Sequence, residues 1–450
     1  MRQYECVEGG TDMTQRGTGF TRRGIMGLGA AGLALAASAP GPARAEKVRT
    51  PARILILGAG AAGTTFANRM VERLEGAEIT LLDDRLQHFY QPGFSLIGAG
   101  LKPARYAVSP TGEWLPAGVR WIKEKAAEID PVGKAVTTAK GTRLAYDYLI
   151  VATGLVLDYG AIEGFSPEMI GTGGIGSVYA GSDAAARTWT AAARFAEEGG
   201  QGLFTRPATE MKCAGAPLKH TFLIDDIARS RGGRPKAEFT YFSNNETLFS
   251  VPIVHEKLRM LFGNRGIATA PSHVLTAIEP GQRRAFFRTP EGLVERPYDY
   301  IHVIPPMRAP EVVRNSPLPW ADRWTDQGWV EVDMGTLRHS RFPEVFAIGD
   351  VAGVPKGKTA ASVKWQVPVV EDHLIAAIEG REGTASYNGY TSCPMITRVG
   401  RAMLIEFDYQ NNLVESFPGL VAPLEELWIS WLMKEIALKA TYNAMLRGRA

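Results

Sequence analysis

A glycine-rich turn near the start of the chain restricts its fold more than any other feature. Residues 54–57 are apolar and suit a buried parallel strand, and residues 64–75 are predicted to form the helix that follows. Between them, Gly58, Gly60 and Gly63 have the spacing of a dinucleotide-binding turn, where glycine permits a tight turn and close approach of a pyrophosphate. The N-terminus of the helix would then face the phosphates.

Three strand ends further along the chain add polar or small residues to this turn. A predicted strand at residues 78–82 ends in an acid that would hold a ribose hydroxyl, and strands at 148–151 and 345–348 end in short turns. The predicted cofactor-binding residues at these ends are Asp83, Ala152, Thr153, Gly154, Gly349 and Asp350. Either later turn alone would be an ordinary strand end. Together, in this order, they resemble the three FAD contacts of the two-dinucleotide-domain flavoprotein superfamily.

The composition permits such a fold and excludes several other classes. The 450 residues suffice for two or three cores, and 45% hydrophobic with 22% charged residues is ordinary for a globular protein. A net charge of +3 is too weak to suggest nucleic-acid binding. We predict an α/β protein with two Rossmann-like domains. The predicted segments are an FAD domain split between 51–160 and 306–380, a second domain at 161–305 and a C-terminal segment at 381–450.

The first 45 residues resemble an export signal. Two adjacent arginines precede an uncharged apolar run and a small-x-small end, the pattern of a twin-arginine signal cut after Ala45. A mobile tail or a packed N-terminal helix is the alternative, and the glycines of the run argue against the packed helix. Export would place the folded protein in the periplasm and remove Cys6, leaving Cys213 and Cys393 where two thiols can pair.

The second predicted domain lacks a glycine turn for NAD(P)H. The glycine-rich segment 171–176 follows a poor strand and is predicted to be a loop. The better strand is 202–206, and the turn after it, residues 207–217, carries Cys213 where a nicotinamide enzyme would have glycines. Pro217 suits the first turn of the following helix. We therefore expect no nicotinamide donor.

Cys213 lies beside Lys212 and just before that helix, and both the ammonium and the helix dipole favour its thiolate. Cys393 lies in a turn-rich stretch before a predicted apolar strand at 395–407. The long separation in sequence excludes a CxxC-type metal site, and no metal is expected. Spacing alone leaves three interpretations open: a structural disulfide, two unrelated buried thiols, or a redox pair beside the flavin.

Five segments are similar to those of sulfide:quinone oxidoreductases, closest to the two-cysteine type that includes the mitochondrial enzyme. They are residues 88–100, 211–217, 358–361, 389–394 and 445–448. The resemblance implies that sulfide attacks an oxidised sulfur bridge, leaving a persulfide on Cys393 and a thiolate on Cys213, and that two electrons pass to FAD. A small acceptor (thiol, sulfite or sulfide) would take the sulfur, and a ubiquinone-type quinone would reoxidise the flavin.

The same resemblance makes Lys358 a candidate for stabilising negative charge on reduced flavin, with a solvent-facing lysine as the alternative. No spare cysteine remains for covalent attachment, so non-covalent FAD is expected. Near the C-terminus, apolar residues from 424 to 432 have helical spacing, include two tryptophans and precede Lys434. Such a stripe suits either core packing or an interfacial helix that admits quinone from a bilayer, with Lys434 and the later basic residues directed toward anionic lipid.

The sequence thus favours a peripheral membrane sulfide:quinone oxidoreductase of the periplasm, which could form a homo-oligomer. One alternative is the flavin subunit of a flavocytochrome c sulfide dehydrogenase, whose haem subunit would be separate because this chain has no CxxCH. The other is a non-catalytic flavin-binding protein with a structural disulfide.

Overall fold

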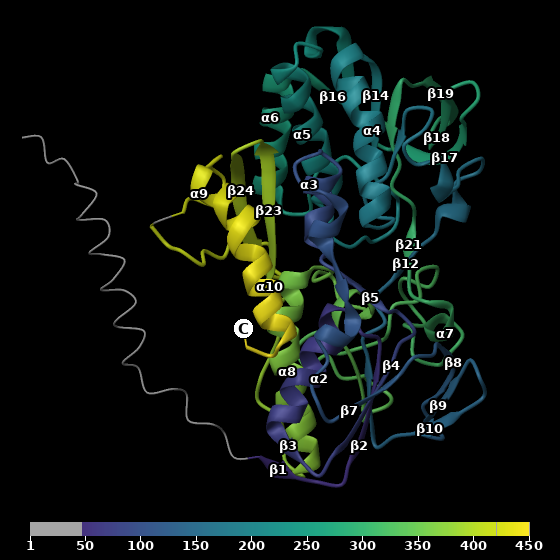
Figure 1. Ribbon diagram of the computed structural model, residues 1–450, viewed down its shortest axis with the longest axis vertical. Helices are drawn as coiled ribbons and strands as arrows, with labels where there is room; N and C mark the ends of the chain where they lie inside the picture. Colours follow the sequence, from purple (N-terminus) through teal and green to yellow (C-terminus); the bar gives the residue numbers. More distant parts are fainter. Residues whose placement is uncertain (1–46, 420, 450) are drawn as a thin grey trace, which may run out of the picture. The chain divides into compact units, whose positions relative to one another are not determined.

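A computed structural model describes residues 47–419 and 421–449 (Figure 1). The predicted export signal at 1–45 lies outside the described residues. Two parallel five-stranded sheets covered by helices dominate the described part, so the predicted α/β fold is confirmed.

The first sheet has the strand order β22-β11-β2-β4-β7, and all its strands are parallel. Its strands are β2 (Arg53–Leu57), β4 (Glu78–Leu82), β7 (Val119–Ile122), β11 (Tyr148–Val151) and β22 (Val345–Ala347). Two helices, α2 (Ala61–Arg73) and α8 (Ala360–Ile378), contact one another beside it. Because β22 follows the second sheet in sequence, the first domain is assembled from two separate parts of the chain.

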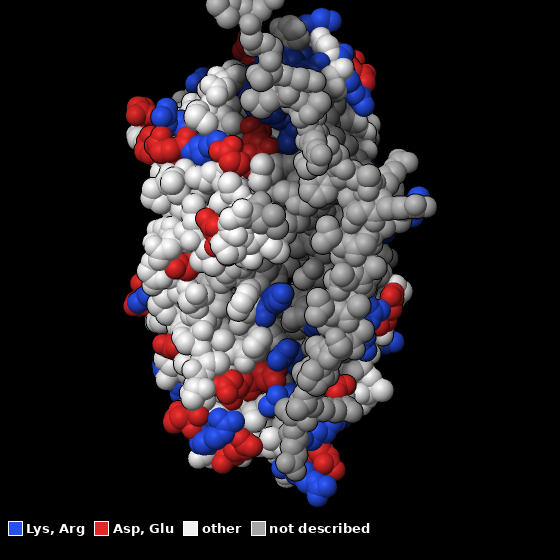
Figure 2. All heavy atoms as spheres, turned by 90° about the vertical axis from the view of Figure 1, so that its left-hand side faces the viewer, with Lys and Arg blue, Asp and Glu red and all other residues white. Residues whose placement is uncertain are grey.

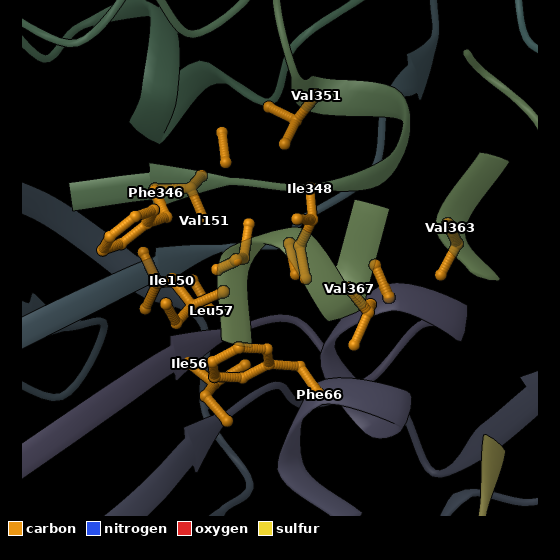
Figure 3. Close-up of a cluster of buried hydrophobic side chains, with 14 of the residues drawn as sticks. Ile56, Leu57, Phe66, Ile150, Val151, Phe346, Ile348, Val351, Val363 and Val367 are labelled. Atoms are coloured by element: carbon orange, nitrogen blue, oxygen red, sulfur yellow. The ribbon is translucent and has the colours of Figure 1, made fainter. Parts of the chain in front are cut away.

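Apolar side chains from both parts meet in one core, shown in Figure 3. Ile56 of β2, Ile150 of β11 and Phe346 of β22 are fully buried, as are Phe66 of α2 and Val367 of α8. Central parallel strands are covered on both faces, which explains why these strands are apolar runs rather than alternating patterns.

The second sheet is also parallel, with the order β13-β20-β14-β15-β16. Its strands are β13 (Ile175–Gly176), β14 (Gly200–Thr205), β15 (Ala237–Phe242), β16 (Ile267–Ala270) and β20 (Tyr300–His302), and its helices are α4 (Ser182–Glu198), α5 (Ala216–Ser230) and α6 (Pro252–Arg265). The poor strand before the glycines at 171–174 is a short 3-10 helix, Pro167–Met169, and these glycines form a turn. The predicted loop at 171–176 is therefore only partly right, because its last two residues, Ile175 and Gly176, form β13 at the edge of the second sheet.

Short elements connect and flank the two sheets. Two antiparallel sheets have three strands each: β8 (Ala126–Asp130), β9 (Ala135–Thr138) and β10 (Arg143–Ala145), and β17 (Val274–Glu279), β18 (Arg284–Thr289) and β19 (Gly292–Pro297). The paired short strands are β1 (Val48–Arg49) with β3 (Leu74–Glu75), β5 (Gln87–Phe89) with β6 (Val108–Pro110), and β12 (Val156–Leu157) with β21 (Met307–Arg308). The short helices are α3 (Phe94–Ile97) and α7 (Glu311–Arg314).

The C-terminal segment begins with an antiparallel hairpin of β23 (Thr391–Arg398) and β24 (Arg401–Phe407). The prediction of a single strand at 395–407 is therefore wrong. Gly400, with a φ of +81°, turns the chain back on itself there. Cys393 consequently lies inside β23 rather than in a turn before the strand.

One continuous helical stretch ends the chain. It comprises α9 (Trp428–Leu432), a π-helical turn (Met433–Ala437) and α10 (Leu438–Leu446). Across residues 47–419 and 421–449, none of the helices combines the length and apolarity that a membrane span requires.

Candidate active site

The glycines of the first turn are required by close backbone contacts. Gly58 has a φ of +108°, and a Cβ there would lie 2.4 Å from the carbonyl oxygen of Ala152. A Cβ on Gly63 would lie 1.9 Å from the carbonyl oxygen of Gly58. Both positions therefore exclude larger residues and allow β2, α2 and β11 to pack closely.

The turn leaves room for a dinucleotide. A Cβ on Gly60 would come no closer than 3.8 Å to its nearest neighbour, Arg85 Nη2, and one on Gly154 would meet none of the described atoms within 4 Å. Gly60 is the N-cap of α2, so the helix N-terminus faces this space. These residues fit the FAD that the superfamily resemblance implies.

Asp83 follows β4, where the sequence placed it, but it already has two partners. Its Oδ2 accepts a hydrogen bond from the Ala59 amide at 2.6 Å and lies 2.5 Å from Arg85 Nη2. Burial alone would raise the pKa of Asp83, but the hydrogen bonds and charge of Arg85 bring it below its usual value. Asp83 is therefore a carboxylate that fixes the turn.

The other two predicted strand ends lie beside the first. The Ala152 amide donates to the Leu57 carbonyl at 2.9 Å, which places Ala152, Thr153 and Gly154 next to the Gly58 turn. Gly349 follows β22 with a φ of +77°, and its amide donates to Gln366 Oε1 at 2.8 Å. The structure thus gathers all nine predicted cofactor-binding residues at the carboxyl ends of the first sheet's strands.

The two cysteines come together from distant parts of the chain. Cys213 lies in the loop between β14 and α5, and Cys393 lies in β23 with its side chain against that loop. The two thiols lie close enough that each is the largest influence on the pKa of the other, and neither cysteine is in a disulfide. Gly215 makes the approach possible, since a Cβ there would lie 2.4 Å from Cys393 Sγ.

The backbone at Cys213 is strained. Its φ of +46° lies in the left-handed region, which costs a non-glycine residue about 1–3 kcal/mol. Hydrogen bonds hold this conformation: the Cys213 amide donates to the Lys358 carbonyl at 2.9 Å, and the Tyr179 hydroxyl donates to the Cys213 carbonyl at 2.9 Å. The strained loop fixes the position of the sulfur.

Two buried lysines, neither of which was predicted to lie there, place positive charge beside the sulfur pair. Lys219 Nζ lies 3.5 Å from Cys213 Sγ. Interaction with Cys393, together with the charges of Lys219 and Lys434, lowers the pKa of Cys213 despite its burial, whereas the interaction with Cys213 raises the pKa of Cys393. Cys213, which lies next to the Lys219 ammonium, is therefore the more acidic thiol of the reduced pair.

Lys212 interacts with Cys213 but is not among the main influences on the pKa of that thiol. Its Nζ lies over the Tyr179 ring, 5.9 Å from the centroid, and Asp350 is the main charge that opposes the effect of its burial. The ammonium group that lies closest to the Cys213 thiolate is that of Lys219. This residue is in the first turn of α5, directly after the loop that carries Cys213.

Lys358 connects the cysteine loop to the Asp350 turn. It is buried, so the solvent-facing alternative is wrong, and its Nζ donates to the carbonyls of Asp350 at 2.6 Å and Ala352 at 3.1 Å. Burial lowers the pKa of Lys358 to about 8, and its Nζ lies 3.8 Å from the centroid of the Trp329 ring. The sulfur site and the predicted flavin site are therefore adjacent.

The C-terminal tryptophans have different environments. Trp431 is 7% exposed and packs in the same core as Cys393, whereas Trp428 is 56% exposed. Lys434, which the interfacial interpretation directed toward lipid, is buried and donates to the Pro92 carbonyl at 2.6 Å. That part of the interpretation is wrong, because the π-helical turn directs Lys434 inward to the cysteines.

Two parallel sheets, a glycine turn and an adjacent cysteine pair define an oxidoreductase of the pyridine nucleotide-disulphide oxidoreductase class, whose family description matches residues 52–195. The mitochondrial sulfide:quinone oxidoreductase of Mus musculus is 37% identical over 399 residues, covering 88% of this chain and 86% of that protein. Its namesake in Dictyostelium discoideum is 33% identical, covering 90% and 88%. The chain belongs to the sulfide:quinone oxidoreductase family, as predicted.

A solved structure has the same fold. The sulfide:quinone oxidoreductase of Aquifex aeolicus superposes with a TM-score of 0.74 at 20% identity, covering 88% of this chain and 92% of that one. These similarities do not favour the flavocytochrome alternative. Because the eukaryotic relatives are named mitochondrial, they also give no support to twin-arginine export or a periplasmic location.

Proposed function

We propose that this protein oxidises sulfide and reduces a quinone, with two electrons leaving the Cys213–Cys393 pair for FAD. The observation that supports this most directly is the approach of Cys393 to the loop of Cys213, with Lys219 Nζ 3.5 Å from Cys213 Sγ, next to the turn that ends in Asp350. Membership of a family named for this reaction supports the same conclusion.

The sulfur chemistry follows from the difference between the two cysteines. Hydrosulfide attacks Cys393 Sγ in the oxidised pair, the bond between the sulfurs breaks, and Cys213 leaves with the electron pair as a thiolate. Lys219 favours this direction because its ammonium stabilises that thiolate. Cys393 then holds the persulfide, whose outer sulfur passes to a small nucleophile such as a thiol, sulfite or a second sulfide.

Loss of the outer sulfur leaves two reduced cysteines, and their return to the oxidised pair releases two electrons. FAD, when bound, supplies the two-electron acceptor between this pair and the quinone. Gly58, Gly60 and Gly63 would hold its pyrophosphate. Cys213 and Cys393 are the cysteines of the described part, and both serve the sulfur chemistry, which supports non-covalent FAD.

We further propose that the protein docks on a membrane through its C-terminal segment. Figure 2, which faces the side where α9 lies, shows a broad area with few charged side chains between groups of charges above and below. In the C-terminal segment, Trp428 and Ile436 are 56% and 65% exposed, and Ile429 and Phe417 are also exposed. Exposed tryptophan and isoleucine on a helix suit the boundary of a bilayer, where quinone is available.

Anaerobic stopped-flow mixing tests the proposal. Sulfide should bleach the flavin absorbance of the holoenzyme on the time scale of stopped-flow mixing, and a water-soluble quinone should restore this absorbance. Cytochrome c in place of quinone should restore it far more slowly. A flavin spectrum that sulfide leaves unchanged would contradict the proposal and favour a non-catalytic flavoprotein.

A further inference from the structure

Two of the segments that carry the family resemblance, 88–100 and 445–448, take no part in the sulfur chemistry, yet the structure brings them together. His88 lies in β5, and Tyr442 lies in α10 directly before the second segment. His88 Nε2 is 2.7 Å from the Tyr442 hydroxyl oxygen, and both side chains are buried. A contact between residues 354 positions apart joins the C-terminal helix to the first domain.

The other nitrogen of His88 contacts the glycine turn. Its Nδ1 lies 3.4 Å from the carbonyl oxygen of Ala59, the residue between Gly58 and Gly60. A carbonyl only accepts, so this contact requires the proton on Nδ1, and Nε2 then accepts from the Tyr442 hydroxyl. Burial lowers the pKa of His88 to about 4, so the imidazole is neutral at neutral pH.

The backbone amide and the backbone carbonyl of Ala59 are both held by hydrogen bonds. The amide of Ala59 donates to Asp83 at 2.6 Å, and its carbonyl accepts from the Thr64 hydroxyl at 3.1 Å and faces His88 Nδ1 at 3.4 Å. Because the two polar groups of a trans peptide point in opposite directions, holding this carbonyl also directs the Gly60 amide away from His88. The orientation of the turn thus depends on Thr64 of α2 and on the His88–Tyr442 pair.

The helix α10 is firmly attached to this domain. Tyr442, Met445 and Leu446 are buried in the core of the first sheet, and the Tyr442 ring lies 5.0 Å from that of Tyr90, centroid to centroid. After the helix, the Arg447 guanidinium lies over the Trp114 ring, 4.4 Å from its centroid. These contacts hold the Tyr442 hydroxyl in position for His88.

We propose that α10 helps the glycine turn to retain FAD. Tyr442 of α10 positions His88, and His88 helps to position the Ala59 carbonyl in that turn. Tyr442 and His88 are positioning residues, since they act through the backbone of the turn. Their role is retention of the cofactor and does not depend on sulfide, quinone or a membrane.

The molecule contains a matched control for this contact. In the second domain, the Tyr300 hydroxyl lies 2.6 Å from His220 Nε2, and both side chains are fully buried. Replacing either tyrosine by phenylalanine removes one hydroxyl from a buried Tyr–His pair. Only Tyr442 is connected to the glycine turn.

The experiment measures release of FAD from the purified holoenzyme, followed by the fluorescence of free FAD after dilution, without sulfide or quinone. Y442F should release FAD about fivefold faster than the wild type, the effect of losing one hydrogen bond, and H88A faster still. Y300F should release FAD at the wild-type rate. FAD release from Y442F at the wild-type rate, or an equal acceleration in Y300F, would overturn the proposal.

Failure of this proposal about α10 is distinguishable from failure of the proposed function. Unchanged FAD release in Y442F would leave sulfide-dependent bleaching of the wild type intact. Conversely, a wild-type protein whose flavin does not respond to sulfide could still release FAD faster in Y442F.

Discussion

The dinucleotide-binding turn and the cysteine pair are assembled in opposite ways. Gly58, Gly60 and Gly63 lie within six residues, and steric contacts between neighbouring strands and a helix determine their identity. The sulfur site instead combines the loop before α5, the hairpin strand β23 and the π-helical turn near the C-terminus. A local site can be altered alone, whereas a site built from distant segments depends on the packing between domains.

The first prediction separates the two sites by removing a sulfur. C213S and C393S should each abolish flavin bleaching by sulfide, with a loss of about 10³-fold or more, because the covalent relay needs both atoms. The FAD content of both variants, measured by absorbance, should remain that of the wild type. Sulfide-dependent bleaching in either variant would show that the cysteines act outside the electron path.

The reverse change damages the turn and spares the sulfurs. In G63A the added Cβ would meet the Gly58 carbonyl oxygen at 1.9 Å, so the turn must open and FAD should be lost during purification. The ratio of flavin to protein absorbance checks this. The cysteines of the apoprotein should still react with iodoacetamide, and retention of full FAD would contradict the steric account.

A third prediction concerns the charge at the sulfur site. In K219M the pKa of Cys213 should rise because an ammonium 3.5 Å away is lost, so less thiolate exists at pH 7. Alkylation of the reduced protein should slow about tenfold at pH 7, and the rate profile should move to higher pH. K212M is the matched control. A larger effect in K212M than in K219M would support the prediction from the sequence that Lys212 stabilises the Cys213 thiolate.

The smallest expected effect is on membrane binding. W428S and I436S should each weaken binding to phospholipid vesicles several-fold, about 1 kcal/mol per side chain, and leave turnover with a water-soluble quinone unchanged. L293S, which removes an exposed leucine from β19, is the control and should bind as the wild type does. Equal loss of binding in L293S would show that the C-terminal segment has no special role.

Local rules predicted most of the first domain from the sequence. The strand at 78–82 has the predicted bounds, and the apolar run before Gly58 and the helix after it lie within two or three residues of their predicted positions. Steric limits on glycine and continuous apolar runs act over short distances, so the chain displays them directly. The same is true of α5, which begins near Pro217.

The sulfur site could be predicted only in part. The two cysteines were identified, but their lysine partners were not, because Lys219 and Lys434 resemble ordinary helix lysines until packing buries them. A helical projection would have placed Lys219 near the loop that carries Cys213. No pattern in the sequence indicates that a π-helical turn directs Lys434 inward, since that depends on how the C-terminal helix crosses β23 and β24.

Labelling with isotopic sulfide tests the central claim, the division of roles between the cysteines, most directly. The oxidised holoenzyme is mixed anaerobically with one equivalent of labelled sulfide, quenched with iodoacetamide and analysed by peptide mass spectrometry. We expect the label as an alkylated persulfide on Cys393, with Cys213 alkylated as a plain thiol. Label found on Cys213, with Cys393 alkylated as a plain thiol, would contradict the account.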